Sequence, residues 1–146
     1  MMNEHVQTIM TRNPVSVDAK ETLAQAILII SKKQVHHLPV LNDGKLVGLI
    51  SSYEITAHYT ASQDPSKVSI AEIMQKKVVK IAPEDKIGTA AELLLDRRFH
   101  ALPVVDGDEL VGIVTSYDVL RYEFRKEYQN PILYREVFDV SYRAAM

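Results

Sequence analysis

The stretch that decides the fold is FHALPVVDGDELVGIVTSYD, residues 99–118. It has an earlier copy, VHHLPVLNDGKLVGLISSYE, at residues 35–54. The two copies align without a gap at an offset of 64 residues, and 9 of the 20 pairs are identical. A unit that occurs only twice, at so long a period, is typical of a duplicated supersecondary unit that buries its core against its own copy. We therefore expect two halves related by a pseudo-two-fold axis.

The apolar spacing predicts the same order of elements in both copies. In the first copy we expect a short helix at 6–10, a strand at 15–17, a helix at 21–33, and two strands at 38–41 and 46–50. Asp43-Gly44 between the last two strands is typical of a tight hairpin turn, because glycine supplies a positive φ. The sequence therefore predicts a mixed α/β (α+β) fold of two β-α-β-β-α units packed through their sheets.

Each copy ends in a serine or threonine that is followed three residues later by an acid. The pairs are Ser51 with Glu54 and Thr115 with Asp118. This spacing, ahead of an apolar helical pattern, is typical of a capping box, in which the two side chains bond backbone N–H groups at the start of a helix. A helix is therefore predicted to begin after the last strand of each unit.

The segments outside the repeats set the domain limits. We predict a first unit at 1–60, a polar linker at 61–68, a second unit at 69–122 and a C-terminal helical extension at 123–146. The extension has no counterpart in the first copy, and residues 132–144 are predicted to form a helix. Its tyrosines, with apolar rings and polar hydroxyls, suit a contact surface.

The composition argues against several classes of protein. Of the 146 residues, 47% are apolar and 25% charged, and the formal net charge is −2, so neither disorder nor a basic nucleic-acid surface is indicated. The absence of cysteine excludes disulfides, zinc–cysteine sites and thiol nucleophiles. No secretory leader is recognisable, and no apolar segment reaches the roughly 18 residues of a membrane span. We expect a cytoplasmic protein that binds neither nucleic acid nor a membrane.

Enzyme and metal motifs are missing as well. The sequence contains no Gly-x-Ser-x-Gly, no glycine-rich phosphate loop ending in Lys-Ser/Thr and no His-Glu-x-x-His, so catalysis is not expected. His36 and His37 are consecutive, and on a strand they would point to opposite faces. We therefore predict no metal site.

The doubled pattern resembles the cystathionine-beta-synthase (CBS) domain pair, also called a Bateman module. The matching features are His-x-Leu-Pro-Val at 36–40 and 100–104, Leu-Val-Gly at 46–48 and 110–112, and the Ser/Thr-x-x-acid ends at 51–54 and 115–118. They extend over about residues 6–122 and keep the family order twice. The resemblance implies a regulatory module whose clefts bind adenosine-containing ligands such as AMP, ADP, ATP, S-adenosylmethionine or NAD. It also implies a homodimer that controls another, unknown protein and requires no cofactor.

By the same resemblance, the main cleft is completed by an acid at a helix start. We expect Asp118 to accept hydrogen bonds from a ribose diol, and Thr115 and Arg121 to hold phosphate. The other residues expected at this cleft are Asn13, Pro14, Val15, Val35, His36, His37, Pro39 and Ser116. Some family members have a phosphate-binding arginine at the position of His37, where a histidine would bind an anion best below about pH 6.5.

A second cleft is expected on the other side of the pseudo-two-fold axis. Its residues are Lys77, Val78, Val79, Phe99, His100, Ala101, Pro103, Ser51 and Glu54. Glu54 stands where the family pattern has an aspartate, and the counterpart of Arg121 is Ala57. We therefore rank the cleft of Asp118 above that of Glu54.

Two structural interpretations remain as alternatives. In the first, Thr115 and Asp118 form a helix cap, which contributes about 1 kcal/mol, and have no role in ligand binding. The whole module can also be a structural homodimerisation domain with vestigial clefts, in which the chain from Tyr122 onward makes the contacts. These two alternatives and the ligand-sensing module make different predictions for stability, because a nucleotide stabilises the folded protein only if it binds to it.

Overall fold

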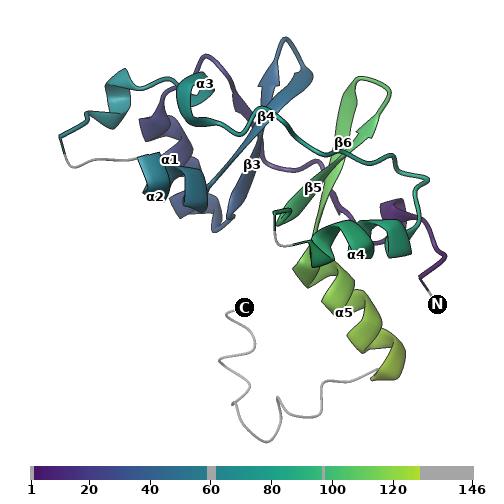
Figure 1. Ribbon diagram of the computed structural model, residues 1–146. Helices are drawn as coiled ribbons and strands as arrows, with labels where there is room; N and C mark the ends of the chain where they lie inside the picture. Colours follow the sequence, from purple (N-terminus) through teal and green to yellow (C-terminus); the bar gives the residue numbers. More distant parts are fainter. Residues whose placement is uncertain (1, 59–61, 97, 129–146) are drawn as a thin grey trace, which may run out of the picture.

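The protein contains two α/β halves that lie side by side (Figure 1). This computed structural model describes residues 2–58, 62–96 and 98–128. In chain order the elements are η1 (Val6–Thr8), β1 (Thr11–Arg12), β2 (Val17–Asp18), α1 (Leu23–Lys33), β3 (His37–Asn42), β4 (Lys45–Ser51), α2 (Ser52–His58), η2 (Pro65–Lys67), α3 (Ile70–Ile73), α4 (Ile87–Leu95), β5 (Ala101–Asp106), β6 (Glu109–Thr115) and α5 (Ser116–Glu127). The predicted order is thus present in both halves, except that residues 79–81, the counterpart of the strand predicted at 15–17, form only an isolated bridge, from Ile81 to Val104.

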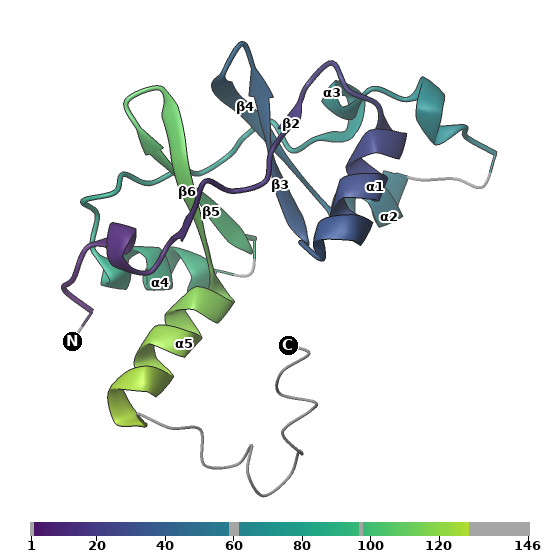
Figure 2. The same cartoon turned by 180° about the vertical axis from the view of Figure 1, so that it is seen from behind.

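Two antiparallel hairpins, β3 with β4 and β5 with β6, form the centre of the molecule. They belong to one six-stranded sheet with the order β1-β6-β4-β3-β2, in which β5 also pairs with β6. The two hairpins join through the pair Lys45 and Glu109. Figures 1 and 2 show α1, α2 and α3 beside the first hairpin, and α4 and α5 beside the second. The fold class predicted from the sequence is confirmed.

The two hairpin turns differ in type but keep the same register. In the first, Asp43 and Gly44 both have a positive φ, 51° and 79°, as a type I′ turn requires. In the second, Gly107 has a φ of 61° and the residue after it does not have a positive φ, which is the pattern of a type II′ turn. The glycine has moved by one position relative to the repeat, and the turn type has changed with it.

Each half completes its core with the short helical segment that precedes the other copy in the sequence. Val6 and Met10, which precede the first copy, are buried among apolar residues of α4, β5 and β6. Ile70, which precedes the second copy, is buried among those of α1, β3 and β4. The backbone follows the same exchange, because β1 pairs with β6 and Gln75 forms a bridge with Leu49 of β4. The two halves are therefore interlocked.

Two glycines allow these crossings. A Cβ atom on Gly112 of β6 would lie 2.5 Å from the sulfur of Met10 and 3.1 Å from the carbonyl oxygen of Thr11. Gly48 of β4 has the same relation to Met74, with a distance of 2.5 Å to its sulfur. A side chain at either glycine would therefore displace the methionine side chain and crowd the backbone oxygen beside it, which lies at 3.1 Å from Gly112 and 3.0 Å from Gly48.

Helix α1 confirms the long helix that was predicted in the first copy. Thr22 caps it, because the threonine hydroxyl oxygen accepts a hydrogen bond from the backbone N–H of Gln25 at 3.3 Å. The helix ends at Lys33, and Gln34 follows in the left-handed conformation with a φ of 53°. The helix predicted at 132–144 lies outside the described residues. Within the described residues, none of the helices has the length and apolar character that crossing a membrane requires.

Replacing Gly112 with alanine is expected to lower the free energy of unfolding by about 1–3 kcal/mol, because a filled core tolerates added atoms poorly. Urea unfolding measures this change. Gly88→Ala in α4 is the control, since its Cβ would approach only Met2, whose carbonyl oxygen lies 3.2 Å away near the start of the chain, and alanine favours a helix. The control is expected to change the same free energy by less than about 1 kcal/mol. A Gly112→Ala variant as stable as the wild type would contradict the tight crossing.

Candidate functional site

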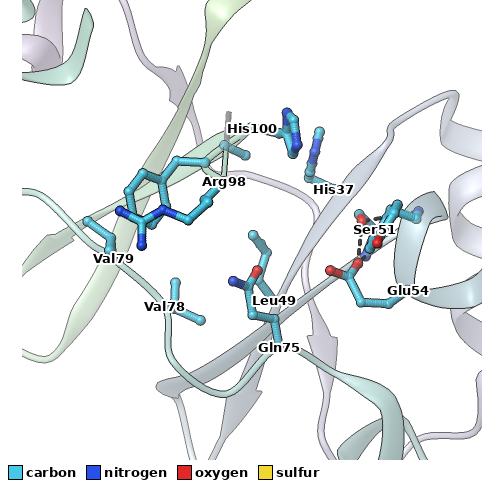
Figure 3. A pocket seen from close by; sticks show the side chains of 12 residues that line it. His37, Leu49, Ser51, Glu54, Gln75, Val78, Val79, Arg98 and His100 are labelled. Atoms are coloured by element: carbon cyan, nitrogen blue, oxygen red, sulfur yellow. Dashed lines mark hydrogen bonds between the residues drawn. The ribbon is translucent and has the colours of Figure 1, made fainter. Parts of the chain in front are cut away.

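A pocket of about 400 Å³ lies at the junction of the two halves (Figure 3). The first half contributes residues of β3, β4 and α2, the second half contributes the entrance to β5, and the segment that follows α3 crosses between them. The lining residues are His37, Leu49, Ser51, Tyr53, Glu54, Gln75, Val78, Val79, Arg98, Phe99, His100 and Ala101. We call this pocket the Glu54 crevice.

Glu54 is held at the start of α2 by the preceding strand. Its Oε2 atom accepts a hydrogen bond from the backbone N–H of Ser51 at 2.7 Å and another from the Ser51 hydroxyl. Thr115 and Asp118 repeat the arrangement in the second half, with distances of 2.9 Å from the backbone nitrogen and 3.2 Å from the hydroxyl. The predicted caps are therefore present, and at Glu54 the Oε1 atom takes no part in the bonds to Ser51.

Two histidines lie together on another side of the crevice. The imidazoles of His37 and His100 are close neighbours in Figure 3, although they come from different halves of the chain. Burial lowers the pKa of His37 below its ordinary value, and the neighbouring charges of His100 and His36 lower it further. Glu54 acts in the opposite direction by a smaller amount. His37 is therefore more easily kept neutral than a histidine in water.

Arg98 adds a permanent positive charge at the rim, across the crevice from Glu54 (Figure 3). Its guanidinium lies 2.8 Å from the Asp96 carboxylate and 5.4 Å from the centre of the Phe99 ring. The hydrogen bond from Arg98 lowers the pKa of Asp96 to about 2. The Asp96 carboxylate therefore neutralises part of this charge, which the guanidinium itself keeps because it does not lose its proton in proteins.

The wall between the charged groups is apolar. It consists of Leu49, Val78, Val79, Phe99 and Ala101, of which Leu49 and Ala101 are buried at the junction of the halves. The crevice therefore offers a carboxylate on one side, cationic groups on another and an apolar surface between them. Such a surface suits a flat, partly apolar ring that carries hydroxyl groups and an anion.

Asp118 lies outside the Glu54 crevice. With a relative exposure of 5% it is buried, and it lines a cavity of about 440 Å³ between the N-terminal segment and α5. One of its carboxylate oxygens lies 3.5 Å from the guanidinium of Arg121. The other residues of this cavity are Glu4, Thr8, Ile9, Met10, Tyr122, Arg125 and Lys126.

The structure brings most of the residues predicted for the second cleft together. Ser51, Glu54, Val78, Val79, Phe99, His100 and Ala101 all line the Glu54 crevice. Lys77 is exposed outside the lining, and Pro103 is fully buried within β5. His37, predicted for the other cleft, lies here too.

The residues predicted for the main cleft are not gathered in one of these two cavities. Asp118 and Arg121 share the cavity beside α5, and His37 is in the Glu54 crevice. Asn13, Pro14, Val15, Val35, His36, Pro39, Thr115 and Ser116 line neither. A ligand site formed by this set stays a prediction.

Four residues of the crevice were missed by the sequence reasoning. They are Leu49, Tyr53, Gln75 and Arg98. Arg98 directly precedes Phe99, which was predicted, so an extension of that segment by one residue would have included it. Among the described residues, no group of three or more His, Asp or Glu side chains is arranged to hold a metal ion.

The CBS domain family model matches the chain twice, at residues 6–60 and 70–125. Among curated proteins, the chain is 32% identical over 123 residues to a homoserine O-acetyltransferase of Methanohalobium evestigatum, a match that covers 83% of this chain. The chain spans about a quarter of the length of the curated acetyltransferases it matches, 24% in this case. It is also 27% identical to the CBS domain-containing protein YhcV of Bacillus subtilis, over 78% of this chain and 81% of that protein.

Solved structures of related proteins also match the chain. The CBS domain pair of protein MJ0100, in complex with 5′-methylthioadenosine and S-adenosyl-L-methionine, matches with a TM-score of 0.75 and 30% identity. The match covers 84% of this chain and 97% of that one. CBSX2 in complex with AMP matches with a TM-score of 0.76 and 25% identity, over 86% and 99% of the two chains.

The lowered pKa of His37 predicts that stability depends on pH. In the unfolded chain this imidazole is protonated near pH 6.5, whereas in the folded protein it is protonated only at a lower pH. The unfolded state therefore binds more protons in the window just below pH 6.5, and the free energy of unfolding falls as the pH falls through that window.

Urea unfolding at about pH 7.5 and 5.5 measures this dependence. His37→Ala, which copies the alanine at the equivalent position 101, is expected to make it shallower. His58→Gln, at an exposed position of α2, is the control and is expected to keep the slope of the wild type. An unchanged slope in His37→Ala would contradict the burial of this imidazole.

Proposed function

Since the chain belongs to the CBS domain family and contains two copies of the domain, we propose that it is a ligand-sensing regulatory module. It binds an adenosine-containing molecule in the Glu54 crevice and passes the resulting change to another protein. The module itself carries out no chemistry in this proposal. The related acetyltransferases match only over a domain-sized part of their length, so their activity does not transfer to this chain.

The observation that supports the proposal best is the placement of Glu54 opposite the cationic groups. The Glu54 carboxylate uses one oxygen for the cap, and the other is available to a ribose diol, which has two hydroxyl donors. The apolar wall around Val79 and Phe99 suits a purine ring. The histidines and Arg98 suit phosphate. All three parts of a nucleotide therefore have a complementary surface within one crevice.

Relatives with bound ligands support the same class of molecule. MJ0100 holds 5′-methylthioadenosine and S-adenosyl-L-methionine, and CBSX2 holds AMP. These ligands share the adenosine group and differ in what the 5′ carbon carries. Adenosine is therefore the part that we propose the crevice recognises first.

A second candidate function is supported by an exposed apolar face on α5. Tyr117, Leu120 and Phe124 lie along this helix and Tyr128 directly follows it, with relative exposures between 43% and 69%. Tyr53, the counterpart of Tyr117 on α2, is 75% exposed. Large apolar side chains gathered on a surface are typical of a contact with another protein. We propose that two copies of the chain form a homodimer through this face, which is compatible with ligand sensing.

Replacing Glu54 with glutamine tests whether the crevice binds an adenosine-containing ligand. The amide oxygen of glutamine can still accept the bonds from Ser51, but the charge that strengthens the bonds to ribose is lost. Affinity is expected to fall by roughly 10–100-fold, as for a lost charged hydrogen bond. Calorimetry with AMP, ATP, S-adenosylmethionine and NADH on the ligand-free protein measures it.

Glu92→Gln, at an exposed position of α4, is the matched control and is expected to bind like the wild type. A folded wild-type protein that binds none of the four ligands at millimolar concentration would end the proposal. If Asp118→Asn weakened binding and Glu54→Gln did not, the site would belong to the cavity beside α5.

Replacing Leu120 with aspartate tests the dimer. The side chain is 69% exposed, so the fold of one chain is expected to tolerate the charge, whereas an apolar interface is not. Light scattering is expected to give about twice the 16.5 kDa of one chain for the wild type and the single mass for the variant. Leu95→Asp, 83% exposed on α4, is the control and is expected to remain dimeric. A monomeric wild type would refute this interface.

A further inference from the structure

We propose that the Glu4 side chain is a clasp that holds the outer half of α5, residues 122–127, and thereby keeps the apolar face of this helix in the position that a second copy of the chain binds. Opening the clasp weakens the homodimer, although no residue of the apolar face is changed. This inference rests on the proposed homodimer, because it concerns what positions the same face, and it does not depend on the ligand of the Glu54 crevice.

Helix α5 has its polar and apolar sides reversed relative to an ordinary surface helix. Asp118, Tyr122 and Lys126 are spaced four residues apart, so they share one side of the helix, and all three line the cavity between α5 and the N-terminal segment. Leu120 and Phe124 of the apolar face are offset from this row by two positions, which places them on the opposite side. The helix therefore turns polar side chains toward the protein and apolar side chains outward.

Apolar packing holds only the first turn of α5. Val119 packs against the core of the second half, and Asp118 is the only buried residue among residues 116–127. From Leu120 onward every residue of the helix is half-buried or exposed, and Figures 1 and 2 show the helix extending away from the sheet. Because most helices in proteins owe their stability to packing, the outer half of α5 needs another contact.

The side chain of Glu4 supplies such a contact. Its carboxylate accepts a hydrogen bond from the Tyr122 hydroxyl at 2.5 Å and lies 3.8 Å from the Lys126 ammonium. The same ammonium lies 4.1 Å from the centre of the Tyr122 ring, so the two side chains of α5 also stabilise each other. The hydrogen bond to Glu4 raises the pKa of Tyr122, so the hydroxyl keeps the proton that it donates.

The backbone of Glu4 is fixed independently, by α4. The Glu4 carbonyl oxygen accepts a hydrogen bond from the backbone N–H of Ile87 at 2.9 Å, and that of Met2 accepts one from Gly88 at 2.9 Å. Two residues after Glu4, Val6 is buried in the core of the second half. An exposed ion pair between two mobile side chains contributes little. Here one partner starts from a fixed backbone and its carboxylate has two partners, so less conformational entropy is lost when the contact forms.

The clasp acts on the dimer through the fraction of molecules in which the outer half of α5 is docked. A surface that is correctly placed in only part of the molecules binds more weakly by that fraction. In a homodimer both copies contribute the same face, so the fraction enters twice. A docked fraction that falls to about one third therefore weakens the dimer by about tenfold.

Replacing Glu4 with alanine tests the clasp, because it removes the carboxylate and leaves the carbonyl group that α4 uses. In protein dilute enough to be monomeric, deuterium uptake by the backbone amides of residues 120–127 is expected to become about threefold faster or more. Analytical ultracentrifugation is expected to give a dimer dissociation constant about tenfold higher than that of the wild type.

Tyr122→Phe removes only the hydroxyl and is expected to weaken the dimer less than Glu4→Ala does, since the ion pair of Glu4 with Lys126 remains. In the Glu4→Ala background the same change is expected to have no further effect, because the hydroxyl has already lost its partner. This double variant shows whether the two side chains act through each other.

Glu84→Ala is the matched control. Glu84 is an exposed acid between Pro83 and Asp85, whose carbonyl oxygens accept hydrogen bonds from the N-terminal segment, and it does not line the cavity beside α5. The control is expected to leave both the deuterium uptake and the dissociation constant unchanged. Thermal melting of each variant establishes that the protein is folded.

The outcomes separate this inference from the proposed homodimer. If the wild type is a dimer and Glu4→Ala changes neither the uptake nor the dissociation constant, or only one of them, the clasp has no such role while the dimer stands. An effect of Tyr122→Phe that is as large in the Glu4→Ala background as in the wild type would also overturn the inference. A wild type that stays monomeric at every concentration would refute the homodimer, and this inference with it.

Discussion

The close contact between a methionine and a glycine, made once in each half, is the constraint on which the rest of the structure depends. Met10 crosses β6 at Gly112, and Met74 crosses β4 at Gly48. These crossings fix how the N-terminal segments exchange between the halves, and the exchange in turn fixes the junction where the Glu54 crevice lies. The shape of the site is therefore set by residues that do not line it.

One helix cap serves two purposes in this fold. The acid that closes the first turn of α2 or α5 satisfies backbone N–H groups with one oxygen, and its position at the end of a strand brings it to a cavity. At Asp118 the second oxygen lies near Arg121, whereas at Glu54 the equivalent partner is absent because Ala57 stands there. The same cap thus leaves Asp118 paired with an arginine in one half, whereas Glu54 has no such arginine in the other.

The order of the elements, the hairpins and the caps could be predicted from the sequence, because they depend on local patterns that both copies repeat. The exchange of Val6 and Ile70 could not be predicted, since a repeat does not reveal which copy a flanking segment packs against. The ranking of the two acids rested on the family aspartate and on Arg121, whose counterpart is Ala57, and it stays a prediction. Arg98 was missed because it lies in an irregular connection, where neither helical nor strand periodicity orients a residue.

The exchange of the flanking segments also bears on how such a chain arose. Because each unit lacks the segment that fills its own core, a single unit of this type has no complete interior, and its missing part is present on any second copy. Two separate single-unit chains can make the same contacts reciprocally, as in a domain-swapped pair. Gene duplication and fusion would then join partners that already recognised each other, and each half would be free to diverge, as position 37 has from position 101.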